Sequence, residues 1–193
     1  MIRLLLIRHG KTDWNAMKKL QGRRDIPLSD TGRRALASFH IPAEYDGFKL
    51  YASPLSRAEE TAKLLSGREI FTDPALIEMD WGDWEGEVVA ELRATLGADF
   101  IENEARGRHM QPPGGESPAM VMDRLRPWLR DLRTDSIAVT HKGVIRALAA
   151  LAFNWDMTGK PPVSFNWTAG HLFEVSEAGD VRPLQMNISL ERE

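Results

Sequence analysis

The 193-residue chain contains no cysteine. Disulfide bonds, thiolate metal sites and a cysteine nucleophile are therefore excluded. An excess of charge of one sign is also lacking, because 28 acidic residues against 25 basic residues leave a net charge of −3. This balance provides no broad electrostatic attraction to nucleic acid or to an anionic membrane surface. We expect neither as a partner.

Long apolar runs are lacking as well. The run at residues 2–7 contains Arg3, is too short for a signal peptide or a membrane span, and is not followed by a small-residue cleavage site. We therefore expect a cytoplasmic protein. The chain length fits a single domain covering residues 1–193. The hydrophobic fraction of 42% is sufficient for a full core.

Apolar runs and helical patterns alternate along the chain. The sequence predicts strands at residues 2–7, 49–53, 70–72, 136–140, 163–167 and 171–176, and helices at 31–40, 55–66, 88–96, 117–133 and 143–153. This alternation predicts an α/β three-layer sandwich, with a mostly parallel central sheet and helices on both faces. Residues 73–86 lack periodicity, which indicates a functional loop, and we expect a small cap-like elaboration around residues 73–116.

Three predicted strands end in residues that suit a phosphate site. The first strand runs into Arg8 and His9, the strand at 136–140 runs into His141, and Arg57 begins the helix after the second strand. Ligands of parallel sheets bind at the carboxyl ends of the strands. Helix N-termini favour anions, and the guanidinium of arginine is planar and always charged. If these side chains converge, they form a phosphate site.

Five motifs, in order, resemble those of the histidine phosphatase (phosphoglycerate mutase-like) superfamily. They are LIRHGKTDWN at 6–15, the glycine-to-glycine segment at 22–32, SPLSRAEETA at 53–62, LIEMDWGDWEG at 76–86 and VTHKGVIR at 139–146. A lone Arg-His-Gly is weak evidence, but five ordered motifs over most of the chain are specific. The acid loop at 76–86 is most similar to the branch of α-ribazole phosphatases and broad-specificity phosphatases.

The resemblance implies a metal-independent enzyme without a cofactor, which acts through a phosphohistidine. His9 would attack phosphorus as a neutral imidazole, because a protonated ring has no free lone pair. Arg8, Arg57 and His141 would stabilise charge on the phosphoryl oxygens in place of a metal ion. Glu78 would protonate the leaving oxygen and then activate water.

The resemblance also places Asn15 and Gly22 among the substrate-binding residues. Asn15 has an alternative role as the cap of a turn. The sequence pattern alone does not choose among the acids of the loop at 76–86, and the resemblance selects Glu78. Lys142 occupies a position at which the family often has glycine, and the role we expect there is a backbone N–H directed at phosphate.

The leading functional prediction is a phosphatase acting on a small phosphomonoester. The first alternative is a phosphoglycerate mutase, whose branch usually has a longer chain and more basic residues after the acid loop than the single Arg93 found at 87–105. The second alternative is a non-catalytic module that binds phosphorylated ligands. Such a module has no need of an acid beside the leaving group. The oligomeric state is not indicated by the sequence.

Overall fold

The computed structural model describes residues 1–192. A six-stranded sheet with the order β3-β2-β4-β1-β5-β6 forms its centre. The strands are β1 (Ile2–Arg8), β2 (Lys49–Ala52), β3 (Phe71–Thr72), β4 (Ser136–Thr140), β5 (Gly170–Val175) and β6 (Val181–Ile188). The first four strands are parallel, and β5 runs antiparallel to both of its neighbours.

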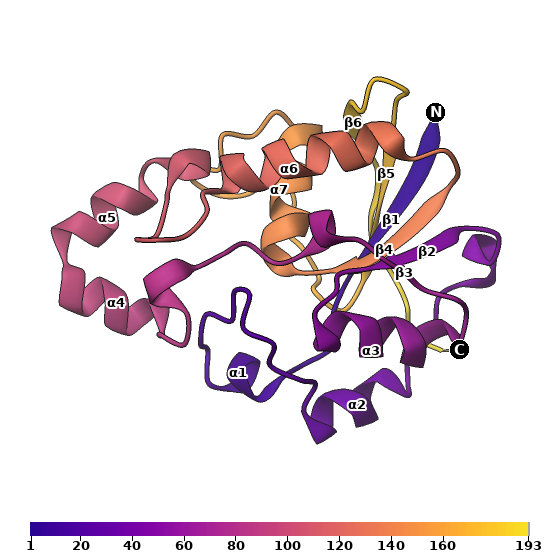
Figure 1. Ribbon diagram of the computed structural model, residues 1–193, viewed down its shortest axis with the longest axis horizontal. Coiled ribbons are helices and arrows are strands. Elements are labelled where there is room, and N and C mark those ends of the chain that lie inside the picture. Colours follow the sequence, from indigo (N-terminus) through magenta and orange to yellow (C-terminus); the bar gives the residue numbers. More distant parts are fainter. Residues whose placement is uncertain (193) are drawn as a thin grey trace.

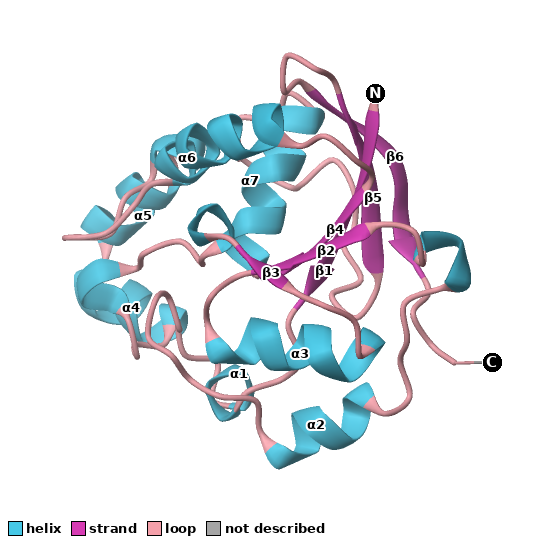
Figure 2. Ribbon diagram, turned by 45° about the vertical axis from the view of Figure 1, so that its right-hand side comes forward, coloured by secondary structure: helices cyan, strands magenta, loops and turns pink. Residues whose placement is uncertain are grey.

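Helices cover both faces of this sheet (Figures 1 and 2). One face carries α2 (Asp30–Leu36) and α3 (Ser56–Ser66), and the other carries α6 (Pro118–Asp131) and α7 (Lys142–Ala152). The remaining helices are α1 (Asp13–Ala16), α4 (Val89–Leu96) and α5 (Ala98–Glu104), with short 3-10 helices at η1 (Ala43–Tyr45), η2 (Pro74–Leu76), η3 (Gly82–Trp84) and η4 (Gly107–His109). The predicted α/β three-layer architecture is confirmed.

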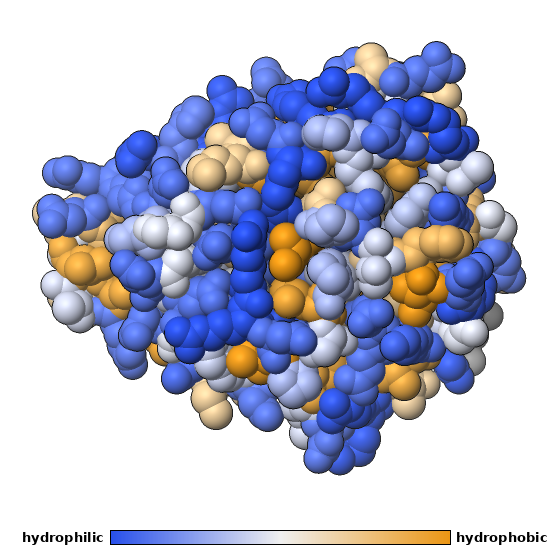
Figure 3. Space-filling view, viewed as in Figure 1, coloured by the Kyte–Doolittle hydropathy of each residue, from blue (hydrophilic) through white to orange (hydrophobic). Residues whose placement is uncertain are grey.

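Strand β1 contributes side chains to two hydrophobic cores, one on each face of the sheet. Successive side chains of a strand point to opposite faces. Leu4 and Leu6 accordingly pack in the core beneath α6 and α7, whereas Leu5 and Ile7 pack in the core above α2 and α3. With both cores buried, hydrophilic side chains predominate on the face shown in Figure 3, where apolar side chains appear in small separate groups. The carboxyl end of β1 is therefore fixed from both sides.

The predicted strand at residues 163–167 is wrong. These residues form an irregular segment that leads into a turn at Trp167. Phe165 and Trp167 stack on each other with ring centroids 5.1 Å apart. Their apolar alternation reflects this local packing rather than a place in the sheet. The strand that the sequence analysis missed is β6, an edge strand containing Pro183, whose alternation is weakened by exposed polar residues. The predicted helix at 31–40 ends at Leu36.

The segment at residues 73–116 contains η2, η3, α4, α5 and η4. In Figure 1, α4 and α5 lie to the left, away from the edge strand β6. A cap-like role for this segment stays a prediction. No helix within residues 1–192 combines the length and the apolar character needed to cross a membrane.

Candidate active site

Parallel pairing of β1 and β4 brings the two motif histidines together. Arg8 lies opposite Thr140 in the ladder, and the backbone N–H of His9 donates to the Thr140 carbonyl at 2.9 Å. The residues that follow these strands are His9 and His141, and the centroids of their rings lie 5.1 Å apart. The predicted convergence of two histidines at one edge of the sheet is what the structure shows.

His9 is held as a neutral imidazole. Its Nδ1 lies 2.7 Å from the carbonyl oxygen of Gly10. Because a carbonyl oxygen only accepts hydrogen bonds, Nδ1 carries the proton and Nε2 keeps a free lone pair. Burial, followed by the charges of Arg57 and Arg8, lowers the pKa of His9 well below its usual 6.5. The ring is thus prepared to act as a nucleophile.

Three buried nitrogen atoms around His9 have no hydrogen-bond partner: Arg8 Nε, Arg57 Nε and His141 Nδ1. Buried polar atoms nearly always have a partner, and leaving one without costs about 1–3 kcal/mol. All three atoms belong to side chains that can donate a proton in a hydrogen bond. A phosphoryl group, with several acceptor oxygens, matches this set.

His141 is fully buried, and its Nε2 lies 2.7 Å from Ser53 Oγ. Burial is the largest cause lowering the pKa of His141 well below 6.5, with further contributions from His9 and Arg57. The His141 ring is therefore neutral at neutral pH. A dianionic phosphate beside it would raise this pKa and favour the charged form.

Arg57 is fully buried at the start of α3, and two backbone carbonyls orient it. Its guanidinium donates to the carbonyl oxygens of Gly22 and Arg24, each at 2.8 Å. Gly22 has a φ of +54°, and a Cβ there would lie 1.8 Å from Glu85 Oε1. The contact that the structure gives Gly22 is thus with Arg57, so that Gly22 positions the arginine. Its predicted substrate contact stays a prediction.

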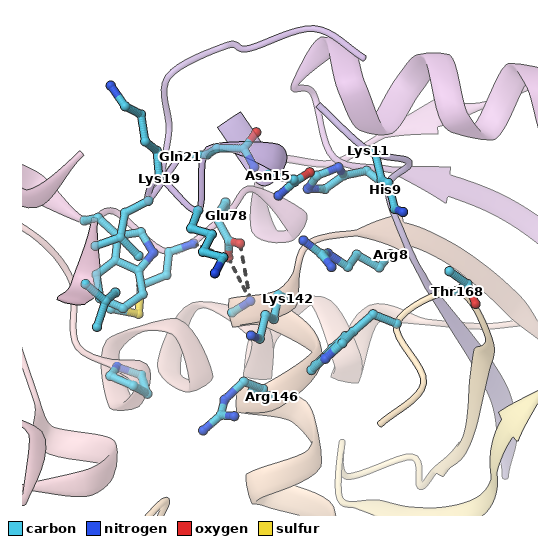
Figure 4. Close-up of a pocket in the computed structure, with 18 of the residues that line it drawn as sticks. Arg8, His9, Lys11, Asn15, Lys19, Gln21, Glu78, Lys142, Arg146 and Thr168 are labelled. Carbon is cyan, nitrogen blue, oxygen red and sulfur yellow. Dashed lines mark hydrogen bonds between the residues drawn. The ribbon is translucent and has the colours of Figure 1, made fainter. Parts of the chain in front are cut away.

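Asn15 both caps a turn and lines the cavity. Its Oδ1 accepts from the Thr12 backbone N–H at 3.0 Å, and its own N–H donates to Thr12 Oγ1 at 3.2 Å, which forms the capping box of α1. In Figure 4, Asn15 lies beside His9. Capping occupies the amide oxygen, so the amide nitrogen is the group left to contact substrate.

Glu78 lies on the acid loop between η2 and η3 and lines the same cavity. Its carboxylate accepts from the backbone N–H of Met79 at 2.8 Å and from that of Gly143 at 3.1 and 3.3 Å. Burial raises the pKa of Glu78 above its usual 4.5. A raised pKa extends the pH range over which a carboxyl group is protonated and can act as a general acid.

The other acids of this loop have different partners. Asp80 lies 3.7 Å from the Arg23 guanidinium and also accepts from the Gly82 N–H. Glu85 accepts from the Arg23 N–H at 2.7 Å. The geometry therefore favours Glu78 as the acid, as the resemblance implied.

The cavity has a volume of about 1100 Å³. Of the predicted site residues, Arg8, His9, Asn15 and Glu78 line it, whereas Arg57, His141 and Gly22 are not part of its walls. The walls also include Lys19, Gln21, Arg146 and Trp167, for which the sequence suggested no role. Arg146 lies within the second histidine motif, so its presence there was the available signal. Among residues 1–192, no group of three or more histidine, aspartate or glutamate side chains is arranged to hold a metal ion.

The family model described as "Histidine phosphatase superfamily (branch 1)" matches this sequence over residues 4–182. The chain belongs to this family. A glucosyl-3-phosphoglycerate phosphatase of Mycolicibacterium vanbaalenii is 34% identical over 180 residues, covering 81% of this chain and 79% of the relative. A 2,3-bisphosphoglycerate-dependent phosphoglycerate mutase of Azorhizobium caulinodans is 35% identical over 165 residues, covering 75% and 78% of the respective chains.

Solved structures of histidine phosphatases share the whole fold. A mycobacterial glucosyl-3-phosphoglycerate phosphatase in complex with VO3 superposes with a TM-score of 0.79 and 29% sequence identity, over 98% of this chain and 100% of the other. The predicted family, fold and enzyme class are therefore confirmed. The similarity to the α-ribazole phosphatase branch stays a prediction, because the relatives named here are glucosyl-3-phosphoglycerate phosphatases and a mutase.

Proposed function

We propose that this histidine phosphatase hydrolyses a small phosphomonoester through a phosphohistidine at His9. The observation that carries the proposal is the arrangement around that ring. A neutral imidazole with a free Nε2 is surrounded by three buried nitrogens that lack partners, and a carboxyl group with a raised pKa lies in the same cavity. A module that only binds phosphate has no use for that carboxyl group.

In the first step, His9 Nε2 forms a bond to phosphorus while the bond from phosphorus to the ester oxygen breaks. Glu78 gives its proton to the departing oxygen, which leaves as an alcohol. Negative charge in the transition state lies on the equatorial oxygens. The N–H groups of Arg8, Arg57 and His141 stabilise that charge. They need little reorganisation, because Arg57 and His141 are fully buried and Arg8 is half-buried.

In the second step, Glu78 is a carboxylate and takes a proton from water. The water oxygen bonds to phosphorus, the bond from phosphorus to His9 Nε2 breaks, and inorganic phosphate leaves. Both side chains return to their starting protonation states. Each step uses groups that the fold already holds.

The mutase is the second candidate, because mutases are among the relatives of this chain. Against it, Arg93 is bound to Glu104 at 2.8 Å and packs over Phe100, so that the one basic residue at 87–105 is already occupied. Arg93 is therefore neutralised and is not available to hold a second charged group of a mutase intermediate.

The products distinguish the two candidates. With p-nitrophenyl phosphate, the enzyme should release one inorganic phosphate per p-nitrophenol. With 3-phosphoglycerate, phosphorus NMR should show inorganic phosphate as the only new species and no 2-phosphoglycerate, with or without 2,3-bisphosphoglycerate. Formation of 2-phosphoglycerate at a rate far above the hydrolysis of any tested ester would establish the mutase instead.

We also propose that the protein is cytoplasmic and has no nucleic-acid partner. The near balance of acidic and basic residues supports the lack of a nucleic-acid partner. Cell fractionation followed by immunoblotting tests the location, and recovery in the membrane or periplasmic fraction would contradict it.

A further inference from the structure

Lys142 and Arg146 lie one helical turn apart on α7, so that their side chains share one face of that helix. Both line the active-site cavity. In Figure 4, Lys142 lies near Arg8 and the Glu78 carboxylate, and Arg146 lies farther along the same helix. The hydrolytic steps described above use neither side chain.

Neither cation has an acidic partner. Among the described residues, Lys142 and Arg146 form no salt bridge, whereas many other arginines of the chain do. Lys142 Nζ lies 5.2 Å from the centroid of the Trp167 ring, and Arg146 Cζ lies 5.1 Å from that of Trp155. These aromatic faces hold the cations without neutralising them.

The charge of the cavity is opposite to that of the whole chain. Its lining contains six basic side chains, namely Arg8, Lys11, Lys18, Lys19, Lys142 and Arg146, against two acidic ones, Glu78 and Glu104. Glu104 is already bound to Arg93. Partial desolvation, followed by repulsion from Arg8 and Arg146, lowers the pKa of Lys142. A cavity with this excess of positive charge attracts an anion that carries more than one charged group.

The position of Lys142 indicates which part of the substrate would carry the second charge. Glu78 must lie within hydrogen-bond reach of the leaving oxygen in order to protonate it. The backbone N–H that holds Glu78 belongs to Gly143, the residue next to Lys142. Groups attached to the leaving oxygen therefore lie nearest to the start of α7, where Lys142 and Arg146 project into the cavity.

We infer that Lys142 and Arg146 form a second anion subsite, which binds a carboxylate on the leaving group of the substrate. This inference rests on the proposed function. The guanidinium of Arg146 offers paired donors that match the two oxygens of a carboxylate, and Lys142 adds a point charge. The substrate class is accordingly the phosphate monoesters of small hydroxy acids.

The test compares two esters that differ in one group. 3-Phosphoglycerate carries a carboxylate where glycerol 3-phosphate carries a hydroxymethyl group. Each is used as a competitive inhibitor of p-nitrophenyl phosphate hydrolysis, so that an inhibition constant is obtained whether or not the ester is turned over. In the wild-type enzyme, we expect the constant for 3-phosphoglycerate to be lower by about tenfold, the effect of one charge-assisted contact.

Substitutions assign the preference to the two cations. In Lys142→Met and Arg146→Met, the ratio of the two inhibition constants should fall toward one, and Lys142→Arg should retain most of it. Lys63→Met removes an exposed lysine of α3 outside the cavity and should leave the ratio and the hydrolysis rate unchanged.

Each outcome bears on a separate claim. Failure to hydrolyse p-nitrophenyl phosphate would count against the proposed function. Normal hydrolysis with equal inhibition constants in the wild-type enzyme would overturn the subsite alone, and this comparison needs no variant to be folded. A loss of p-nitrophenyl phosphate turnover in Lys142→Met as large as the loss of 3-phosphoglycerate affinity would also overturn it, because Lys142 would then act on the transferred phosphoryl group.

Discussion

The backbone N–H of Gly143 donates to both carboxylate oxygens of Glu78, at 3.1 and 3.3 Å. A Cβ at residue 143 would lie only 2.3 Å from Glu78 Oε1. Glycine is therefore required for the acid to reach this position. The contact joins the acid loop to the start of α7, which follows His141 directly. It therefore fixes Glu78 relative to His141, whose ring lies beside that of His9.

Replacing Gly143 with alanine should displace Glu78 without removing it. We expect kcat for an alkyl phosphate to fall by about 10-fold to 100-fold, because even a small misplacement of a catalytic group is costly. Gly47→Ala is the matched control, since a Cβ there meets no atom within 4 Å. Equal activity of the two variants would show that the contact does not position the acid.

Replacing Glu78 with glutamine keeps the shape of the side chain but removes the transferable proton. For alkyl phosphates, kcat should fall by about 10²–10⁴. Aryl phosphates have leaving groups that need less protonation, so their loss should be smaller. Steady-state kinetics with one ester of each kind checks this. Equal losses for both, or a larger effect of Asp80→Asn, would move the acid elsewhere in the loop.

The pH dependence follows from two opposite shifts. The pKa of His9 is lowered well below 6.5, so the neutral nucleophile persists on the acid side of pH 6.5 and is lost only as the pH falls further. The pKa of Glu78 is raised above 4.5, so the required acid is lost as the pH rises through that elevated value. We expect kcat/KM to show both limbs in the wild-type enzyme.

The Glu78→Gln variant is the control for that profile. It should lose the limb that falls with rising pH, apart from the ionisation of the substrate itself, and it should keep the limb set by His9. An acid limb centred at or above pH 6.5 would contradict the neutral state assigned to His9.

The sequence predicted the fold and the convergence of His9 and His141, for reasons that lie in local pattern and motif order. A strand buried on both faces is mostly apolar, and residues 2–7 and 136–140 could be recognised by this feature. The strand β6 could not, because an edge strand with exposed alternate residues resembles a loop. The sequence at residues 163–167 resembles a strand because its apolar residues, which include Phe165 and Trp167, occur at every second position. In the structure, these two rings stack on each other instead.

The protonation and the contacts of the site side chains could not be predicted from the sequence. The resemblance placed His141 among the groups that stabilise charge on the phosphoryl oxygens, but the pKa of His141 depends on burial and on neighbours that only the fold brings near. The link of Gly22 to Arg57 likewise joins residues 35 positions apart. The unneutralised state of Lys142 depends on its tertiary neighbours, because no pattern in the sequence shows that an acid is not close to it.

Catalysis should need no metal ion. Charge on the phosphoryl group is matched by the donors of Arg8, Arg57 and His141. Prolonged dialysis against EDTA should therefore leave the hydrolysis of p-nitrophenyl phosphate nearly unchanged, with a known magnesium-dependent phosphatase treated in parallel as the control. Loss of activity that is restored by Mg²⁺ or Zn²⁺ would indicate a different mechanism.

The central claim is that His9 carries the phosphoryl group. It is tested by rapid quenching of the enzyme during turnover, followed by peptide mass spectrometry under alkaline conditions, in which phosphohistidine survives. The account predicts an acid-labile phosphate on the peptide containing His9, present in the wild-type enzyme and accumulating when Glu78→Gln slows its hydrolysis. A His9→Ala variant that hydrolyses alkyl phosphates at the wild-type rate, or a phosphate found on another residue, would contradict it.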